Sequence, residues 1–238
     1  MSDLFNLIAL TLLAGLAMPL GALGASVERI RPLWLEQEFR HSVLAFGGGT
    51  LLSAVTLVLV PQGMAHLSPV WVAVFLVLGG FAFLALDRAL SRRDTPASML
   101  MLMLADFVPE SIALGAVFAL DSGQALLLAV LIALQNLPEG FNAYRELRGK
   151  AQLGRNKIIA LFALAALLGP VAGLTGYQWL SSYPQGMSAI MLLASGGILY
   201  SVFQDLAPQV KMRKRWGPPM GAIFGFAAGL VGQMVLRR

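Results

Sequence analysis

Residues 99–146 read MLMLMLADFVPESIALGAVFALDSGQALLLAVLIALQNLPEGFNAYRE, and this stretch decides the fold of the chain. Its two long apolar runs, Met99–Leu120 and Ala125–Glu146, are separated only by a short polar turn. Each run is close to the ~20 residues that a helix needs to cross a bilayer. We therefore expect two antiparallel transmembrane helices, packed side by side, at the centre of the sequence.

The rest of the chain has the same apolar character. Hydrophobic residues make up 58% of the 238 residues and charged residues 12%, whereas a typical soluble domain carries roughly 25% charged residues. Lipid can face apolar helices, but a soluble fold of this composition would lack the polar groups to cover its core. We expect an all-α polytopic membrane protein in which residues 1–238 form a single transmembrane domain. Six further runs bring the predicted spans to eight: Leu4–Gly24, Val43–Met64, Val70–Ala89, Ile158–Leu180, Met187–Leu206 and Pro219–Leu236.

The basic residues predict the orientation of these spans. Fifteen of the 17 Lys and Arg residues fall in the loops that follow the first, third, fifth and seventh runs, and the other loops have none. The positive-inside rule makes the basic face cytoplasmic, so both termini should be outside a cell inner (plasma) membrane. The same scatter over separate loops argues against nucleic acid as a partner, despite the net charge of +5.

Polar residues deep in the two central runs are the candidate functional residues, because polar groups are costly in hydrocarbon. They are Asp106, Glu110, Gln135, Asn136 and Glu139. The i, i+4 spacing places Asp106 and Glu110 on one face of their helix, and Gln135 and Glu139 on one face of the next. Counting from the intervening turn at ~1.5 Å per residue puts Glu110 level with Gln135, and Asp106 level with Glu139. The side chains can therefore meet near the membrane centre.

Two prolines add to this pattern as helix-breaking support for the site. Pro109 and Pro138 cannot donate a backbone hydrogen bond, so each frees a carbonyl one turn earlier. Carboxylate, amide and carbonyl oxygens suit a divalent cation. We predict that Asp106, Glu110, Gln135 and Glu139 are metal ligands, with Asn136 as a secondary ligand or an orienting group. The metal would be the transported substrate, with no tightly bound cofactor, and without it at least one carboxylate should take up a proton.

At these residues the chain resembles the ZIP family of divalent-metal transporters, whose signature is a pair of successive helices with Pro-Glu motifs. The likeness covers the whole chain. Val60-Pro61-Gln62 and Ala207-Pro208-Gln209 resemble degraded forms of the Pro-Glu endings that the family has in its second and seventh helices. The resemblance implies a 3+2+3 arrangement, with inverted pseudo-repeats around the fourth and fifth helices.

The departures from the family pattern predict an altered site. Asp106 stands where the family usually has His, and Gln135 with Asn136 replaces His-Asn. Phe107 replaces an Asn that helps form a second metal position, and Gly169 stands where many members have Glu. The resemblance therefore implies a primary site built only from oxygen ligands and a second site that is largely lost. Manganese, iron(II) or magnesium become candidate ions beside zinc.

Three interpretations remain open from the sequence. The leading one is a transporter that carries a divalent cation toward the cytoplasm by alternating access. The second is a transport-inactive relative that senses metal or binds a partner, and the third is a proton-coupled carrier of another small solute. An enzyme is disfavoured because no nucleophile–base pair or hydrolase motif lies at depth. The expected partners are the lipid bilayer and divalent cations, with a homodimer as a further candidate.

Overall fold

The computed structural model describes residues 2–28, 33–91, 95–150, 153–180, 182–210 and 216–236, and in these ranges every regular element is a helix. Eight stretches are long and apolar enough to cross a membrane, which confirms the predicted number. They are α1 (Ser2–Val27), α2 with η1 and α3 (Leu33–Ala54, Val55–Leu59, Val60–Met64), α4 (Pro69–Ser91), α5 (Pro96–Leu120), α6 (Ser122–Lys150), α7 with α8 and η2 (Arg155–Ala166, Leu168–Thr175, Gly176–Leu180), α9 with η3 and α10 (Pro184–Ser201, Val202–Leu206, Ala207–Val210), and α11 (Gly217–Leu236).

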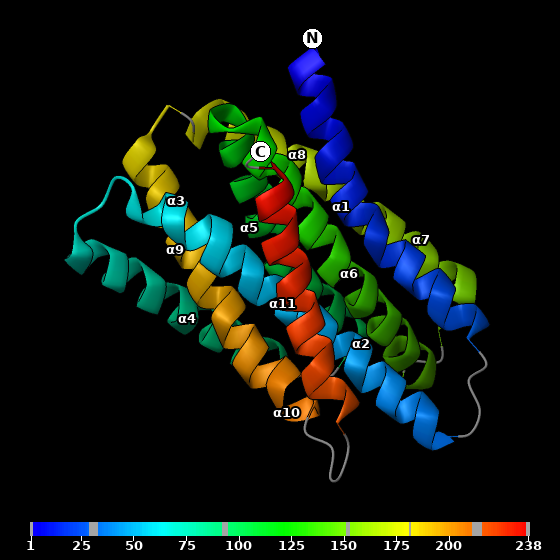
Figure 1. The fold of residues 1–238 in the computed structure, drawn as a ribbon. Coiled ribbons are helices and arrows are strands. Elements are labelled where there is room, and N and C mark those ends of the chain that lie inside the picture. Colours follow the sequence, from blue (N-terminus) through cyan, green and yellow to red (C-terminus); the bar gives the residue numbers. More distant parts are fainter. Residues whose placement is uncertain are drawn as a thin grey trace.

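Successive spans run in alternating directions, so the N- and C-terminal ends lie toward the same end of the bundle (Figure 1). The C-terminal ends of α1, α4, α6 and α10 lie at the opposite end, and the sequence concentrates its basic residues near these helix ends. This arrangement agrees with the alternation of charge that was used to predict the orientation. Many of those basic residues lie outside the described ranges: Arg29, Arg31, Arg92, Arg93, Lys211, Arg213, Lys214 and Arg215.

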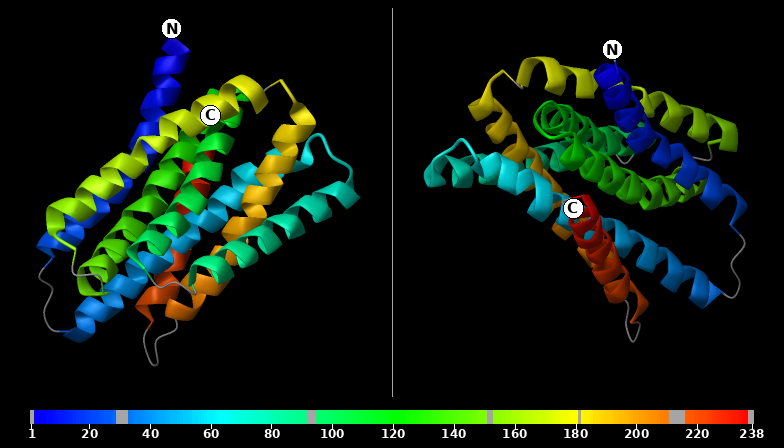
Figure 2. Two further views of the ribbon diagram at one scale, coloured as in Figure 1. Left: turned by 180° about the vertical axis from the view of Figure 1, so that it is seen from behind. Right: turned by 45° about the horizontal axis from the view of Figure 1, so that its top comes forward.

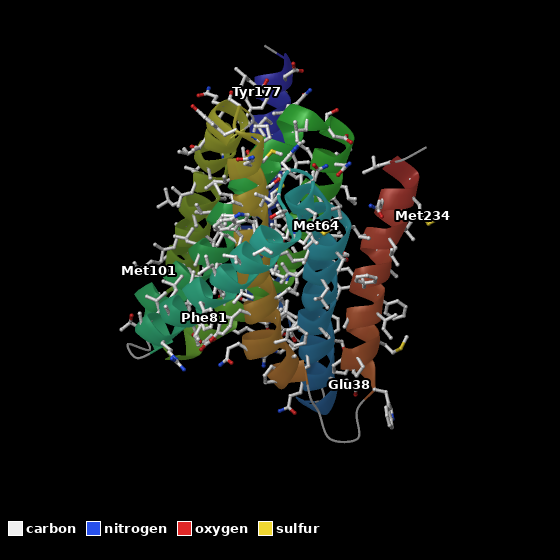
Figure 3. All side chains as sticks on the ribbon, turned by 90° about the vertical axis from the view of Figure 1, so that its left-hand side faces the viewer. Glu38, Met64, Phe81, Met101, Tyr177 and Met234 are labelled. Carbon is white, nitrogen blue, oxygen red and sulfur yellow. The ribbon has the colours of Figure 1, made fainter. Side chains whose placement is uncertain are left out.

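The two central helices of the sequence are also central in space. Figure 2 shows α5 and α6 side by side, with α1, α7 and α8 on one side and α2, α9 and α11 on the other. The outermost spans are α4 and α11, whose apolar side chains point away from the bundle, such as Phe81 and Met234 (Figure 3). These side chains are 61% and 64% exposed, as expected for helix surface that faces lipid.

Glycines set how closely the spans pack. Where α1 meets α6, a Cβ added to Gly21 would lie 2.0 Å from the Leu137 carbonyl oxygen, and one added to Gly140 would lie 2.2 Å from the Met18 oxygen. Each helix therefore needs a glycine for the other's backbone to approach, which is the packing role expected of small residues in membranes. Reciprocal glycine contacts of this kind also join α2 to α11 (Gly49, Gly225), α4 to α9 (Gly79, Gly196), and α5 to α8 and η2 (Gly115, Gly176).

These contacts repeat in the two halves of the chain. The first span (α1) packs on the fifth (α6), and in the same way the sixth span (through α8) packs on the fourth (α5). The second span (α2) packs on the eighth (α11), and in the same way the seventh span (α9) packs on the third (α4). The second and seventh spans also share a local irregularity. Each contains a π-helical segment, Val55–Leu59 or Val202–Leu206, that is separated by one residue from its Pro-Gln pair. Gly49 precedes Pro61 by twelve residues, and Gly196 precedes Pro208 by twelve. The backbone thus supports the 3+2+3 arrangement with related outer halves.

The three consecutive glycines of α2 bring that helix against the centre of the bundle. A Cβ on Gly47 would lie 2.9 Å from Pro138 Cγ of α6, and one on Gly48 would lie 3.4 Å from Leu206 of η3. A Cβ on Gly49 would lie 2.1 Å from the Ala222 oxygen of α11. Three neighbouring positions on α2 therefore contact three different spans. One of these contacts is at Pro138, beside the candidate site.

Candidate functional site

A buried hydrogen bond joins the two Pro-Glu helices. The side-chain nitrogen of Gln135 in α6 donates to Glu110 Oε2 in α5 over 2.8 Å. The two side chains are 4% and 2% exposed, and both lie near the middle of their spans. The contact confirms that Glu110 and Gln135 lie level across the helix pair. It also explains how an acidic side chain is tolerated at this depth, because a buried carboxylate needs hydrogen-bond donors.

The neighbouring amide extends this contact to the first span. Asn136 Nδ2 donates to the carbonyl oxygen of Ala14 in α1 over 2.9 Å, and Asn136 Oδ1 accepts from Gln135 Nε2 over 3.1 Å. A backbone carbonyl can only accept, so the nitrogen of Asn136 must face Ala14 and its oxygen must face Gln135. The Gln135 nitrogen then uses one proton on Asn136 and the other on Glu110. The chain from Ala14 to Glu110 therefore fixes the orientation of both amides.

These hydrogen bonds leave one atom of the Gln135 amide that could bind a cation. Because the nitrogen is committed to Asn136 and Glu110, the carbonyl oxygen Oε1 is the atom that can bind a positive ion. In this structure Asn136 is hydrogen-bonded to Gln135, and its role as a secondary ligand or an orienting group stays a prediction. The Ala14 carbonyl was not anticipated from the sequence, since a backbone oxygen on a distant span leaves no signal in residue types.

The other two predicted carboxylates surround this chain. Asp106 is partly buried in α5 and accepts a hydrogen bond at Oδ1 from the Ser201 hydroxyl at the end of α9, over 3.3 Å. Glu139 is partly buried one turn after Gln135 in α6. Both carboxylates lie near enough to Glu110 for their charges to repel its own. Sequence reasoning missed Ser201, because nothing distinguishes it from the other serines of its span.

The carboxylates lie near one another but do not form a complete metal-binding site in the described part of the chain. Within the described ranges, no three His, Asp or Glu side chains come close enough together to hold one ion. Glu110, with Asp106 and Glu139 near it and an oriented amide oxygen beside it, is nonetheless an oxygen donor set of the kind that hard divalent cations prefer. A cation entering between α5 and α6 would relieve the repulsion of Glu110 by these carboxylates and draw the side chains inward. The ligand roles of Asp106, Glu110, Gln135 and Glu139 stay predictions.

The prolines leave the helices unbroken. α5 continues through Pro109 and α6 through Pro138, so each proline is a gap in the hydrogen-bond ladder and not the end of a helix. The Pro138 ring instead packs against Gly47 of α2, as described above. Neighbouring helices commonly support such prolines in membrane proteins. Both prolines therefore still leave a backbone carbonyl free one turn earlier, and Pro138 in addition packs against α2 beside the site.

Two departures from the family pattern contact one another. The Phe107 ring is 1% exposed and its tip lies between α1 and α8. A Cβ added to Gly169 would lie 2.8 Å from Phe107 Cζ, and one added to Gly15 would lie at the same distance. The large ring is accommodated because both neighbours lack side chains. The place that the resemblance assigns to a second metal position is therefore filled by an aromatic ring.

A separate polar group lies toward the end of the bundle that carries the termini. Gln62, from the predicted Pro-Gln remnant of the second span, donates to Gln124 Oε1 over 3.0 Å. Gln124 in turn donates to Asp121 Oδ2 over 3.1 Å. These bonds join α3 to the start of α6. The side chain of Gln209, in the matching remnant of the seventh span, lies outside the described residues.

Comparison with known proteins finds a relative that the chain matches along its length. No model of a known protein family matches the chain. The chain is similar to the zinc transporter ZupT of Chlorobium phaeovibrioides, with 26% identity in an alignment that covers 97% of this chain and 96% of the relative. The likeness is therefore end to end, as the resemblance of the paired motifs implied. The eight spans, the related outer halves, the paired Pro-Glu helices and this end-to-end similarity to a zinc transporter together support the resemblance to the ZIP family.

Proposed function

We propose that this protein transports a divalent metal cation across the membrane, with the ion held between α5 and α6. Asp106, Glu110, Gln135 and Glu139 would be its ligands, and Asn136 would orient Gln135. The observation that carries the proposal is the buried chain from Ala14 through Asn136 and Gln135 to Glu110. Such a chain is costly at membrane depth unless it serves a function. The similarity to a zinc transporter supports zinc, manganese or iron(II) as the class of cargo.

The geometry suggests how the site would load and release the ion. Asp106 and Glu139 each repel a charged Glu110 when no cation is present, so an incoming divalent ion would replace that repulsion with attraction. A proton on one carboxylate would leave as the metal binds, which links the two ions. Because α5 and α6 are enclosed by the other spans, access from either side requires the outer helices to move against them. This motion is alternating access.

The direction and location are part of the same proposal. We propose net flux toward the cytoplasm, and from the positive-inside distribution of charge we infer a cell inner membrane with both termini outside. The chain has no cysteine, so single introduced cysteines can test this. Gln185 and Gly154 are exposed at opposite ends of the bundle. In intact cells, a membrane-impermeant maleimide should label Gln185→Cys and spare Gly154→Cys until the cells are permeabilised. The reverse pattern would refute the orientation.

Transport itself is tested in proteoliposomes. Uptake of zinc, manganese, iron(II), cadmium and magnesium should be measured for the parent and for the Glu110→Ala/Glu139→Ala variant. We expect flux of at least one ion in the parent and none in the double variant. Equal flux in both proteins would refute the site. The ranking of the ions would show what Asp106 does in the place of the family's usual His.

A second candidate function is a metal-binding member that does not transport. The packing of Phe107 against Gly169 favours it, because part of the family's metal-binding apparatus is replaced by core packing. This alternative predicts measurable metal binding to the purified protein with no flux in the same liposomes. Flux of a small organic solute driven by a proton gradient, with no metal binding, would instead support the proton-coupled carrier.

A further inference from the structure

Ser201 bonds a carboxylate of another span, whereas most serine and threonine hydroxyls described in the bundle bond a backbone carbonyl of their own helix, and Ser188 bonds the backbone carbonyl of Gln62. Ser195, two turns earlier in α9, returns its hydrogen bond to its own helix, at the Met191 carbonyl over 2.7 Å. Ser53 does the same at Thr50 in α2, over 2.7 Å. This is the usual way for serine to satisfy its hydroxyl in a membrane helix. Ser201 instead donates across the interface between spans to Asp106, an acidic side chain of the candidate site.

The backbone around Ser201 is arranged to present it. Ser201 is the last residue of α9, directly before the π-helical segment η3. In the related half of the chain, Ala54 occupies the matching position, directly before η1. The two halves thus share the irregular backbone, while only the seventh span carries a hydroxyl there. π-helical segments within α-helices are frequently found at functional sites.

The residue before Ser201 anchors the same part of α9. Tyr200 Oη donates to Asp87 Oδ2 of α4 over 2.8 Å, and both side chains are partly buried. Tyr200 and Ser201 therefore bond carboxylates on two different spans, α4 and α5. The bond to α4 restrains the end of α9 against its neighbour. A restrained helix end holds the Ser201 hydroxyl in one place relative to Asp106.

We propose that Ser201 is a positioning residue for Asp106 and that it sets which cations the site accepts. The inference rests on the proposed function, in which Asp106 is a ligand. A hydroxyl on Oδ1 fixes the plane of the carboxylate and biases it toward binding an ion through the other oxygen. Calcium often takes carboxylates through both oxygens, whereas smaller divalent ions need a tighter shell of fewer ligands. Ser201 would therefore favour the small ions and disfavour calcium.

Matched variants on one helix test this inference. The dissociation constant of the best-transported ion should be measured by calorimetry on purified Ser201→Ala, Ser201→Thr and Ser195→Ala, with calcium as competitor, beside uptake in liposomes. Removing a hydrogen-bond partner of a ligand typically weakens metal binding about 10- to 100-fold. We expect Ser201→Ala to bind the ion about 10-fold more weakly and to be inhibited by calcium at lower concentration. Ser201→Thr, which keeps the hydroxyl, and Ser195→Ala should match the parent.

The outcomes separate this inference from the proposed function. If the parent binds and transports while Ser201→Ala keeps its affinity and its discrimination against calcium, the role of Ser201 is refuted and the transport function stands. Equal losses in Ser195→Ala or in Ser201→Thr would also refute it, since they would indicate helix packing. A parent that binds metal without flux would refute transport alone, and the calorimetry would still decide the role of Ser201. A parent that binds no ion of the panel would overturn both.

Discussion

Two neighbouring faces of α5 contact the rest of the bundle in different ways, although the residues of one directly follow those of the other in sequence. Asp106 and Glu110 lie on one face and bond to side chains of α9 and α6. Phe107 and Ser111 follow them on the next face, which packs against α1 and α8. On the first face the polar groups have hydrogen-bond partners across helices. On the second, a ring fills the space and the buried Ser111 hydroxyl has no partner among the described residues.

The difference shows which face of α5 carries the polar groups of the candidate site. Hydrogen bonds between spans hold the orientation of Gln135 and Glu110, so the first face is specified by its chemistry. The second face is specified by volume, because Phe107 fits only where Gly15 and Gly169 have no side chains. Substitutions on the two faces should therefore affect different measurements. The first face should control ion binding and flux, and the second should control stability.

The largest effect should come from removing charge on the first face. Glu110→Gln keeps the size of the side chain but loses the negative charge that a divalent ion requires, and we expect uptake to fall about 100-fold or more, beyond the usual cost of an outer-shell change. Proteoliposome uptake at saturating metal measures it, with size-exclusion chromatography as the check on folding. A variant with parental uptake would show that the ion does not bind at this face.

The next effect is on stability and belongs to the second face. Gly169→Ala would place its Cβ 2.8 Å from both the Thr11 carbonyl oxygen and Phe107 Cζ, so the helices must separate. We expect a loss of about 1–3 kcal/mol, the usual cost of overpacking, measured as thermal unfolding in detergent. Adding Phe107→Leu should recover part of it. Gly149→Ala is the control, because a Cβ there meets nothing within 4 Å. Equal stability of Gly169→Ala and the parent would contradict the packing described.

A smaller effect should follow from releasing the amide chain. Asn136→Ala removes the link between Ala14 and Gln135, so the Gln135 amide can rotate away from its bound orientation. We expect metal affinity to weaken about 10-fold, as for other outer-shell partners, with calorimetry as the measurement. Asn142→Ala is matched to it, since Asn142 lies in the same helix and bonds only locally to the Pro138 carbonyl. Identical affinities in the two variants would rule out an orienting role for Asn136.

The smallest effect is predicted beside Glu110 on the second face. Ser111→Ala removes a buried hydroxyl that has no partner in the described part of the chain, so it relieves a desolvation cost without breaking a bond. Stability should stay equal or rise by up to about 1 kcal/mol, and uptake should be unchanged. Thermal unfolding and uptake are both required. A clear loss of flux would show that the ion-binding region extends to this face, and the contrast between the two faces would then be lost.

Much of the fold could be predicted from the sequence, because its determinants are local. The eight spans follow from runs of apolar residues, and the central hairpin follows from the short turn between residues 120 and 125. The level match of Glu110 with Gln135 also follows, since helical rise converts residue counts into depth. In each case the physical quantity depends only on neighbours in the chain. The resemblance to the ZIP family likewise follows from the two Pro-Glu motifs.

The tertiary structure decided what those residues contact. Ala14 of the first span and Ser201 of the seventh form hydrogen bonds with residues of the candidate site, and no local sequence pattern marks either of them. The orientation of the Gln135 amide depends on a backbone oxygen more than a hundred residues away. The fit of Phe107 between two glycines likewise depends on how α1, α5 and α8 pack. Sequence spacing fixes the depth and face of a side chain, whereas its partners depend on which helices pack together, and that is a property of the whole bundle.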